Sequence, residues 1–517
     1  MNFLEGITPR DYQTKIFETC LKKNCLVVLP TGLGKTLISL MLTIERMKEF
    51  PGEKVLFLAP TKPLAEQHLN YFKKHLPELF ADMQLFTGAI NAEKRKKIWK
   101  TADIIFSTPQ CIANDLKNNL YNLNEICLLV EDEAHRCLKN YDYNYVAQQY
   151  KKQAEHQRTT GLTASPGSEK RKIKEICKNL SIEEVELRTR ESEDVKKYLQ
   201  ELKSEKITLD FPPKFEEIRK ILRNIFEGYI GELRSRKLLF GFASKTELIR
   251  LQKKISFSIS RGNKNFNYFL GASACAQAIR IQHALELLET QTLKSFSEYL
   301  KKLFEQAEKT KNKGISKLIS KPEFNFAFKK TEDLIGKNIE HPKIEKLIEI
   351  IHEEKRKDVK TKIIIFTQFR DTASQISKKI NAIKKINSKI FVGQTMKKGI
   401  GLKQKEQKKV IDEFSNGKID VLCATCIGEE GLDIPEVNVV IFYEPIASAI
   451  RTIQRGGRTA RLMSGKIIIL VTKKTRDEAY FYVSKAKEKK MYDAIDSIKK
   501  DFENNVSLKT DEQIKLK

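Results

Sequence analysis

The strongest constraint on the fold is a series of short, wholly apolar runs that alternates with helical patterns and occurs twice along the chain. The first series comprises residues 25–29, 55–59, 104–107, 126–130 and 160–162. The second comprises residues 363–366, 390–392, 421–423, 439–442 and 467–470. Strands that are apolar throughout, with enough chain between them for a helix, are typical of a parallel sheet covered on both faces. The sequence therefore predicts two α/β domains.

The stretch between the two series differs, because residues 215–330 contain few β-like runs and many apolar residues at helical spacing. Residues 245–330 also carry 17 Lys or Arg against 7 Glu and no Asp. Such a stretch can be only the solvated face of a helix, but so large an excess in an insertion between two domains favours contact with a nucleic-acid backbone. Residues 310–322, rich in Lys, Gly and Ser, are expected to form a mobile loop.

The charge balance of the whole chain indicates the same kind of partner. Its 517 residues include 95 Lys or Arg against 67 Asp or Glu, a net charge of +28, and this excess favours a polyanion. Nine scattered cysteines do not resemble the even framework of a small secreted domain. We find neither an apolar run long enough for a bilayer span nor a leader pattern. We therefore expect no membrane partner and a cytoplasmic, nucleoid-associated protein.

The first apolar run leads directly into Pro-Thr-Gly-Leu-Gly-Lys-Thr, which a helical pattern follows. This is the strand, glycine loop and helix of a phosphate cradle. Gly32 and Gly34, with Thr31, allow backbone N–H groups to face phosphates, Lys35 can reach the β and γ phosphates, and the Thr36 hydroxyl can ligate Mg²⁺. The sequence therefore predicts ATP and Mg²⁺ as cofactors.

Two adjacent carboxylates follow the apolar run 126–130, at the end of a buried strand where α/β sheets bind their ligands. We assign Asp132 to holding Mg²⁺ and Glu133 to orienting or deprotonating the attacking water. His135 is expected to communicate between this site and a Thr-Ala-Ser segment that contains Thr163 and Ser165. Ser165 lacks the Gly-x-Ser-x-Gly turn of a hydrolase nucleophile, so hydrolase chemistry through it is not predicted.

Far downstream, a predicted helix carries Arg458 and Arg461, which are three residues apart and therefore share a face. Paired arginines of this kind can reach a γ-phosphate across a domain cleft. An arginine finger is worth about 10³ to 10⁵ in rate where its contribution has been measured. We therefore count both arginines as candidate catalytic residues.

Nine blocks in order along the chain resemble the motif series of superfamily 2 DEAH-box helicases. They are residues 10–13, 30–36, 59–61, 107–110, 132–135, 163–165, 366–369, 424–435 and 454–461. The amino-acid sequences of several blocks are most similar to the helicase part of the family that contains the archaeal Hef helicases and the Fanconi anaemia M proteins. The resemblance covers about residues 5–490.

The resemblance implies two RecA-like domains with a helical insertion. The implied divisions are an ATP-binding domain at 1–190, a connector at 191–215, a basic helical insertion at 216–332, a second RecA-like domain with the arginine fingers at 333–490 and a charged tail at 491–517. It also implies further nucleotide contacts: Arg10 and Gln13, the latter at adenine, Gly431 and Asp433 near the ribose and γ-phosphate, and Gln454 at the phosphate or the attacking water. The implied nucleic-acid contacts are Pro60, Thr61, Thr108, Gln110, Thr367, Gln368 and Thr425.

The function that the resemblance implies is an ATP-dependent DNA helicase or translocase with 3′–5′ polarity. Its expected substrate is forked or branched DNA, or a junction of single and double strands, in replication-fork repair and recombination. One alternative is a double-stranded RNA-dependent ATPase of the Dicer and RIG-I-like type. A second alternative is a binding scaffold that has lost turnover, against which the complete set of chemical residues argues.

The sequence also departs from the family pattern. Gly456 stands where relatives commonly have Arg, and Ala460 where they have Gly, which affects the expected shape of the finger helix. The archaeal relatives typically continue into a nuclease, and this sequence has no nuclease signature, so a separately encoded nuclease partner is a hypothesis. Cys423 and Cys426 form an isolated C-x-x-C without a second pair at zinc-site spacing, so no metal is predicted there.

Overall fold

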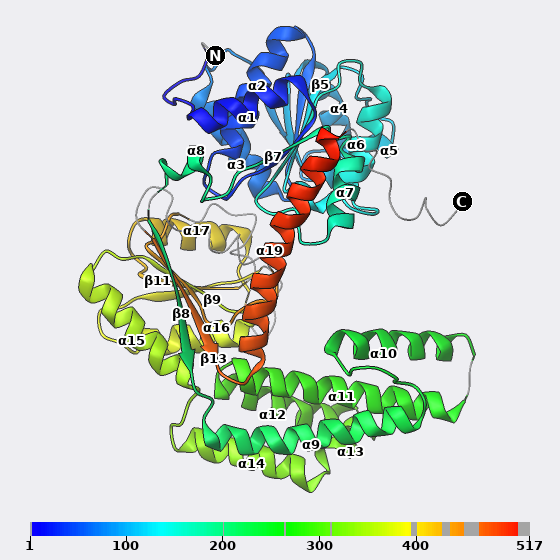
Figure 1. The fold of residues 1–517 in the computed structure, drawn as a ribbon, viewed down its shortest axis with the longest axis vertical. Helices are drawn as coiled ribbons and strands as arrows, with labels where there is room; N and C mark the ends of the chain where they lie inside the picture. Colours follow the sequence, from blue (N-terminus) through cyan, green and yellow to red (C-terminus); the bar gives the residue numbers. More distant parts are fainter. Residues whose placement is uncertain are drawn as a thin grey trace.

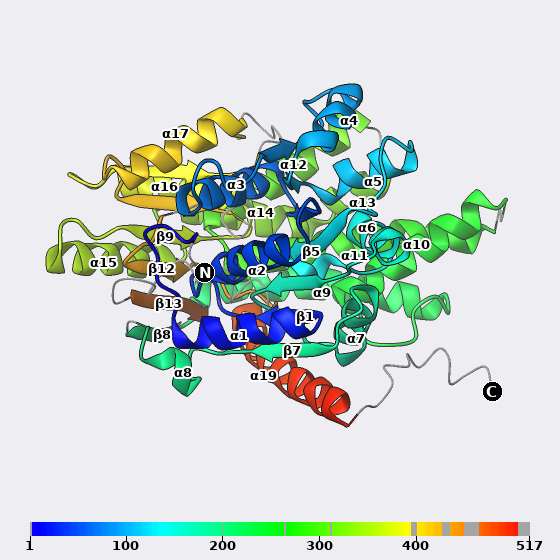
Figure 2. The ribbon, with the colours of Figure 1, turned by 90° about the horizontal axis from the view of Figure 1, so that it is seen from above.

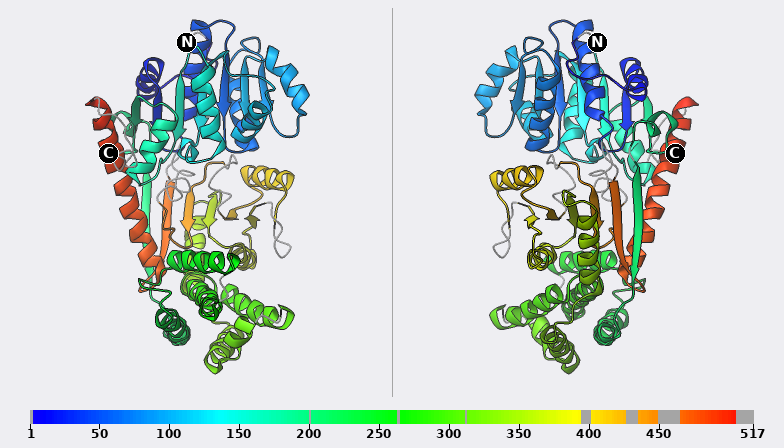
Figure 3. Two further views of the ribbon diagram at one scale, coloured as in Figure 1. Left: turned by 90° about the vertical axis from the view of Figure 1, so that its right-hand side faces the viewer. Right: turned by 90° about the vertical axis from the view of Figure 1, so that its left-hand side faces the viewer.

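The computed structural model describes residues 3–199, 201–262, 265–310, 313–393, 401–425, 435–448 and 465–504. Figure 1 shows a first sheet domain at the top, a second in the middle and a set of helices below it. Figure 3 shows the same three parts stacked from both sides, with one long helix running along an edge of the stack. The predicted architecture of two parallel-sheet domains with a helical insertion is confirmed.

The first domain contains a seven-stranded sheet with the order β3-β4-β2-β5-β6-β1-β7. Its strands are β1 (Cys25–Val28), β2 (Lys54–Leu58), β3 (Met83–Phe86), β4 (Ile104–Ser107), β5 (Ile126–Asp132), β6 (Thr159–Thr163) and β7 (Glu184–Leu187). Its helices are α1 (Asp11–Lys22), α2 (Lys35–Glu49), α3 (Lys62–His75), α4 (Ala92–Thr101), α5 (Pro109–Lys117), the 3-10 turn η1 (Ala134–Arg136), α6 (Asp142–Gln153) and α7 (Lys170–Asn179). Every strand pair is parallel.

Alternate residues of each central strand enter two separate cores, because side chains of a strand point to opposite faces. In β1, Cys25 and Val27 pack with α1, α2 and α3, whereas Leu26 and Val28 pack with α5, α6 and α7. Figure 2 shows these helices around the sheet from above. Both faces are covered, which explains why the central strands read as continuous apolar runs.

The second domain contains a six-stranded sheet with the order β10-β11-β9-β12-β13-β8. Its strands are β8 (Leu202–Leu209), β9 (Ile363–Phe366), β10 (Ser388–Phe391), β11 (Val421–Ala424), β12 (Val439–Phe442) and β13 (Gly465–Thr472). Its helices are α15 (Pro342–Lys357), α16 (Arg370–Asn381) and α17 (Gln404–Ser415). The region expected to be a connector, 191–215, instead supplies the short helix α8 (Glu193–Lys196) and the edge strand β8, which pairs along its whole length with β13.

The insertion is a bundle of helices with its own apolar core. It comprises α9 (Pro213–Ser235), α10 (Lys245–Ser260), α11 (Phe266–Thr290), α12 (Leu293–Thr310), α13 (Lys313–Ile319) and α14 (Pro322–Gly336). The expectation of a loop at 310–322 is wrong for most of that segment, because Ile315 and Leu318 of α13 are buried in the insertion. Two apolar residues among lysines were enough to dock one short amphipathic helix.

The long helix α19 (Arg476–Glu503) connects the far parts of the molecule. It begins beside the insertion and ends against the first domain, where it lies next to α7 (Figure 1). Met491, Ile495 and Ile498 are buried in the same core as α5, α6 and α7. The sequence predicts a charged tail at 491–517 that is partly helical, and residues 491–503 are helical; their packing against the first domain, through the buried Met491, Ile495 and Ile498, was not predicted.

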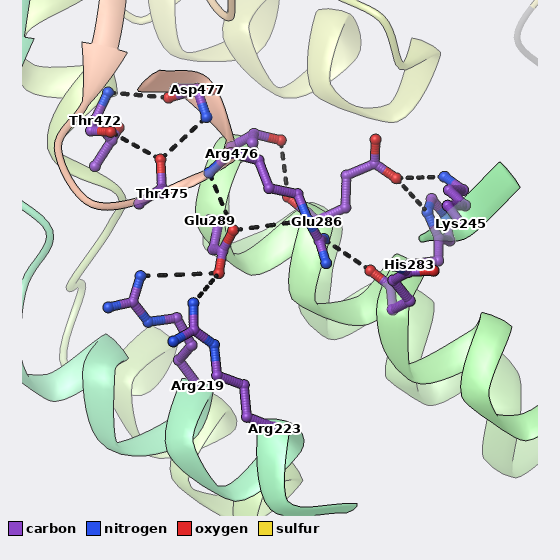
Figure 4. Close-up of polar contacts among 12 residues, drawn as sticks. Arg219, Arg223, Lys245, His283, Glu286, Glu289, Thr472, Thr475, Arg476 and Asp477 are labelled. Carbon is purple, nitrogen blue, oxygen red and sulfur yellow. Dashed lines mark hydrogen bonds and ion pairs between the residues drawn. The ribbon is translucent and has the colours of Figure 1, made fainter. Parts of the chain in front are cut away.

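A network of charged residues fixes the start of α19 to the insertion (Figure 4). Glu289, whose side chain is 3% exposed, lies 3.3 Å from Arg223 and 3.8 Å from Arg219, and it accepts a hydrogen bond from the backbone N–H of Arg476. The Thr475 side chain caps α19 by accepting from the backbone N–H of Asp477. Because Glu289 is buried, these arginines supply the charge that makes its burial tolerable.

No helix among the described residues is long and apolar enough to cross a membrane.

Candidate nucleotide and nucleic-acid site

The glycine loop between β1 and α2 has a shape that only glycine permits at two positions. Gly32 and Gly34 have φ of +88° and +81°, a region that side chains rarely adopt. A Cβ at Gly34 would lie 2.2 Å from Nε2 of Gln13. Nε2 of Gln13 and the Tyr12 hydroxyl both donate to the carbonyl of Leu33, at 3.1 and 2.8 Å. The first turn of α1 thus holds the loop in position.

Two of the predicted nucleotide-binding residues, Arg10 and Gln13, are hydrogen-bonded to each other. Gln13 accepts a hydrogen bond from the backbone N–H of Arg10 at 2.8 Å, so both lie at the start of α1 beside the glycine loop. Lys35, the first residue of α2, donates to the carbonyl of Leu29 at 2.8 Å. The ammonium group of Lys35 therefore lies over the glycine loop, where the predicted phosphate contacts are.

A histidine that the sequence analysis missed links the two predicted magnesium ligands. His68 of α3 lies between the Thr36 hydroxyl, 3.4 Å from its Nδ1, and the Asp132 carboxylate, 2.9 Å from its Nε2. A carboxylate only accepts hydrogen bonds, so Nε2 donates to Asp132. His68 and Asp132 are each 7% exposed. The imidazole therefore orients both oxygen ligands from a third element.

The electrostatics of this pair favour the form of Asp132 that binds a cation. Burial opposes its ionisation, but the hydrogen bond and charge of His68, with the charge of Lys35, outweigh burial and lower the pKa of the carboxyl group. A hydroxyl and an ionised carboxylate are the hard oxygen ligands that Mg²⁺ prefers, with the remaining positions left to water and phosphates. The residues present therefore fit a magnesium-nucleotide.

Glu133 follows Asp132 in a strained conformation. Its φ is +52°, which is uncommon outside glycine and asparagine and often marks functional sites. Its Oε2 lies 3.3 Å from Nδ1 of His135. That nitrogen also lies 3.3 Å from the Thr163 hydroxyl, whose oxygen accepts from the backbone N–H of Ser165. The predicted coupling residues are therefore in one chain of contacts.

This chain of contacts continues into α19. The Ser165 hydroxyl donates to Sδ of Met491 at 2.8 Å, and both residues are buried. The helix that carries Met491 starts at the insertion network described above, so it connects the Thr-Ala-Ser segment with the insertion. No local pattern in the sequence indicated this contact, because its two residues are 326 positions apart.

The expected nucleic-acid contacts of the first domain follow two adjacent strands. Thr61, after β2, and Thr108, after β4, are the N-cap residues of α3 and α5, and each helix has a proline in its first turn. Neither side chain makes the usual capping hydrogen bond, and the buried Thr61 hydroxyl has no hydrogen-bond partner among the described residues. Pro60 and Gln110 lie beside them. Free N–H groups at helix starts suit phosphate oxygens.

The contacts expected in the second domain also follow two adjacent strands, β9 and β11. Thr367, however, is fully buried and donates to Glu444 at 3.1 Å, and the backbone N–H of Gln368 donates to the same carboxylate. Gln291 at the end of α11 also approaches Thr367. The Thr367 hydroxyl is thus occupied within the protein, which leaves Gln368 as the more accessible of the two. Thr425 is buried beside them at the end of β11.

A cleft of about 760 Å³ begins at Thr36 and His68 and extends between the two domains. One wall is α3 of the first domain and the other is α17 of the second. Lysines line it from both sides: Lys62, Lys74, Lys405 and Lys408. Gly431, Asp433, Gln454, Arg458 and Arg461 lie outside the described residues.

Three family models match consecutive parts of the chain. The DEAD/DEAH box helicase model matches residues 10–173, the model described as "Putative ATP-dependent RNA helicase, helical bundle" matches residues 214–334, and the Helicase conserved C-terminal domain matches residues 342–463. The crystal structure of the Pyrococcus furiosus Hef helicase domain is similar over 92% of this chain and 98% of that chain, with 42% identity and a TM-score of 0.71.

Curated proteins show the same similarity. A protein of Methanocaldococcus jannaschii named "Putative ATP-dependent RNA helicase" is 38% identical over 93% of this chain and 60% of its own length. The Fanconi anemia group M protein homolog of Mus musculus is 32% identical over 94% of this chain and 26% of its own length. The ATP-dependent DNA helicase mph1 of Neurospora crassa is 33% identical over 91% and 41%. The chain therefore spans 60% or less of these relatives' lengths.

Proposed function

The chain belongs to the family of superfamily 2 helicases that contains Hef and the Fanconi anemia M proteins, and from this we propose that it is an ATP-driven motor on forked or branched DNA. Relatives named as DNA helicases support DNA as the substrate. The observation that carries the proposal is the interdomain cleft: Thr36 and His68, next to Asp132, form one end of it, and the second domain forms its far wall. A nucleotide there would touch both domains.

In this mechanism Thr36 and Asp132 would hold Mg²⁺, and Lys35 would contact the β and γ phosphates. When bound there, the metal would supply a positive charge that stabilises charge on the transferred phosphoryl group. Glu133 orients the attacking water and takes its proton. Gln13 reads adenine with Arg10 beside it, and Thr31, Gly32 and Gly34 supply backbone N–H groups. The family resemblance assigns Arg458, Arg461 and Gln454 to the γ-phosphate, and Gly431 and Asp433 to the nucleotide.

The site is coupled to the nucleic acid through His135, Thr163 and Ser165. A strand lies across the carboxyl edges of both sheets and contacts Pro60, Thr61, Thr108 and Gln110 in the first domain. In the second domain it contacts Gln368 and Thr425, with Thr367 acting through Glu444. Closure of the domains around ATP, and their opening after hydrolysis, moves the two sets of contacts relative to each other. The 3′ to 5′ direction of movement along the strand is proposed from the family resemblance.

A second candidate is a double-stranded RNA-dependent ATPase. It is favoured by one observation: the model that matches the insertion, and the archaeal relative, are both named for RNA helicases. The basic charge of the insertion does not distinguish DNA from RNA, because both backbones are polyanions.

The test is steady-state ATP hydrolysis with single-stranded DNA, a DNA fork, a four-way junction and duplex RNA of equal length. The proposal predicts the strongest stimulation by the fork or the junction. Stimulation by duplex RNA alone would establish the second candidate, and hydrolysis unaffected by any of the four would contradict both.

A further inference from the structure

Exposed aromatic side chains are concentrated at one end of the insertion. Thirteen large hydrophobic side chains of the described residues are exposed, and six of them fall within residues 240–269. Phe240 and Phe242 are each 85% exposed. A single exposed phenylalanine is ordinary, but a group of them on one surface marks an interaction site. The six come from the loop before α10, from α10 and from the start of α11, and Figure 1 shows α10 on the side of the insertion that is away from the second sheet.

The loop that carries Phe240 and Phe242 is anchored, so their exposure is not that of a loose segment. Leu239 is 4% exposed and belongs to the insertion core. Leu238 packs so closely on α11 that a Cβ at Gly271 would lie 2.1 Å from its Cδ1. Two leucines therefore hold the loop against the bundle while the following phenylalanines face outward.

Both phenylalanines line the same hollow, which has a volume of about 460 Å³. Glu247, Leu251 and Lys254 of α10 form its other side, and Glu247 forms an ion pair with Arg250 at 3.5 Å. This volume is within the range of about 300–1,000 Å³ that binds small organic groups. An aromatic wall beside a lysine suits a flat ring that is attached to an anion.

The charge around the hollow selects the partner. Residues 236–262 contain seven Lys or Arg and a single acidic residue, Glu247. Lys237, Lys253 and Lys254 are exposed, and none of the three has an ion pair within the described residues. Aromatic side chains interleaved with free cations are the combination that binds single-stranded nucleic acid, because bases stack on the rings and phosphates approach the cations.

We propose that Phe240 and Phe242 form a stacking platform for unpaired bases, and that the basic residues around them hold the adjoining phosphates. This inference rests on the proposed function and adds to it, since it assigns the insertion a contact with bases exposed at a junction. Paired bases are stacked on their neighbours and are not available to the platform. The insertion then distinguishes a junction from continuous duplex by the presence of unpaired bases, without reading their sequence.

The test compares three variants in the absence of ATP. Phe240→Leu/Phe242→Leu keeps apolar bulk and removes the rings, Phe240→Trp/Phe242→Trp keeps aromatic faces, and Phe326→Leu is the control, because Phe326 is 57% exposed on α14 outside the hollow. Affinity is measured for a DNA fork with unpaired arms and for a fully paired blunt duplex. Stacking contributes about 1–3 kcal/mol per base, so we expect the leucine pair to weaken fork binding by about tenfold or more. Its binding of blunt duplex should change by less than about twofold, and the tryptophan pair and the control should bind the fork as the wild type does.

A photochemical probe locates the contact directly. A fork with 5-iodouracil at the unpaired position next to the branch, irradiated on the wild-type protein, should crosslink to the tryptic peptide of residues 238–245. Equal fork affinity of the leucine pair and the wild type, or a crosslink only to other peptides, would contradict the platform. A wild-type protein that binds none of the DNA probes would contradict the proposed function as well.

Discussion

At the residue scale, the site depends on a backbone position that only glycine can occupy. Gly34 has a positive φ and no room for a Cβ, because Gln13 fills the space beside it. This single position links the loop to the start of α1, so the loop and Gln13, the residue predicted to contact adenine, depend on each other's position. Substitution there should affect nucleotide binding and folding at once.

We predict that Gly34→Ala lowers the free energy of unfolding by about 1–3 kcal/mol, because it introduces both a strained backbone and a clash. It should also weaken ATP binding, since the loop must move. Gly231→Ala is the matched control: it lies within α9 with no atom within 4 Å of the added Cβ, and should be neutral or stabilise by up to about 1 kcal/mol. Denaturant titration measures the free energy of unfolding, and calorimetry measures ATP binding. Equal stability and equal ATP affinity of the two variants would contradict the role given to Gly34.

The residues of the site were predictable from sequence only where they belong to contiguous blocks. Lys35, Thr36, Asp132 and Glu133 follow strands and a glycine turn, so local pattern and chemistry agree. His68 was not predictable in this way, because it contacts Asp132 across 64 positions. One signal was present: His68 shares a helix face with Ala65, Leu69 and Phe72, and a polar side chain on an apolar face requires a partner.

At the element scale, the central strands were predictable, and of the four edge strands only β10 was. All ten predicted strands are present, and nine of them are central strands, whose burial on both faces requires continuous apolar residues. The three others, β3, β7 and β8, lie at sheet edges, where one side is partly solvated and charged residues are tolerated. The pairing of β8 with β13 joins segments more than 250 residues apart, which no local pattern encodes.

The docking of α19 gives a prediction at this scale. Ile495→Ala should destabilise the first domain by about 2–5 kcal/mol, because it leaves a cavity under the end of the helix. Val483→Ala, on a 41% exposed part of the same helix, should cost less than about 0.5 kcal/mol. Urea unfolding of both variants is the measurement. If Ile495→Ala were as stable as Val483→Ala, the packing of α19 on the first domain would be wrong.

The ion pair between α10 and α11 gives a prediction about how stability depends on pH. Burial raises the pKa of Glu286, but hydrogen bonds and charge from His283 and Lys245 outweigh it and lower the pKa to about 2 (Figure 4). The unfolded chain protonates this group near pH 4.5, so its stabilising effect is complete above that pH and is lost as the pH falls toward 2. Between pH 6 and pH 4 the wild type should lose about 1 kcal/mol that Glu286→Gln does not lose. Urea unfolding of both proteins at pH 6 and pH 4 is the measurement. An equal loss of stability in the wild type and in Glu286→Gln would contradict the assigned role of Glu286.

At the scale of the whole molecule, charge and architecture act together. The net charge of +28 favours a polyanion as partner. In the proposed function, this charge supplies affinity that does not depend on the type of nucleic acid, and the positions of the two sheet edges and the insertion account for a preference among structures.

Because phosphate contacts release counterions, binding of a DNA fork should weaken steeply with salt, by about 10³-fold or more between 50 and 200 mM for six or more contacts. Fluorescence anisotropy across this salt range measures the slope. A flat response would mean that the basic residues of the insertion do not contact the backbone.

The central claim is that ATP hydrolysis at the interdomain cleft drives movement along DNA, and strand release from a labelled fork tests it most directly. The wild type should release the strand only with ATP and Mg²⁺, and duplexes with a 3′ or a 5′ tail should report the polarity. Glu133→Gln should bind ATP and the fork but slow hydrolysis and release together by about 10²–10⁴-fold, whereas Glu131→Gln, at the buried neighbouring position, should retain both. Hydrolysis or strand release by Glu133→Gln at the wild-type rate would contradict the account.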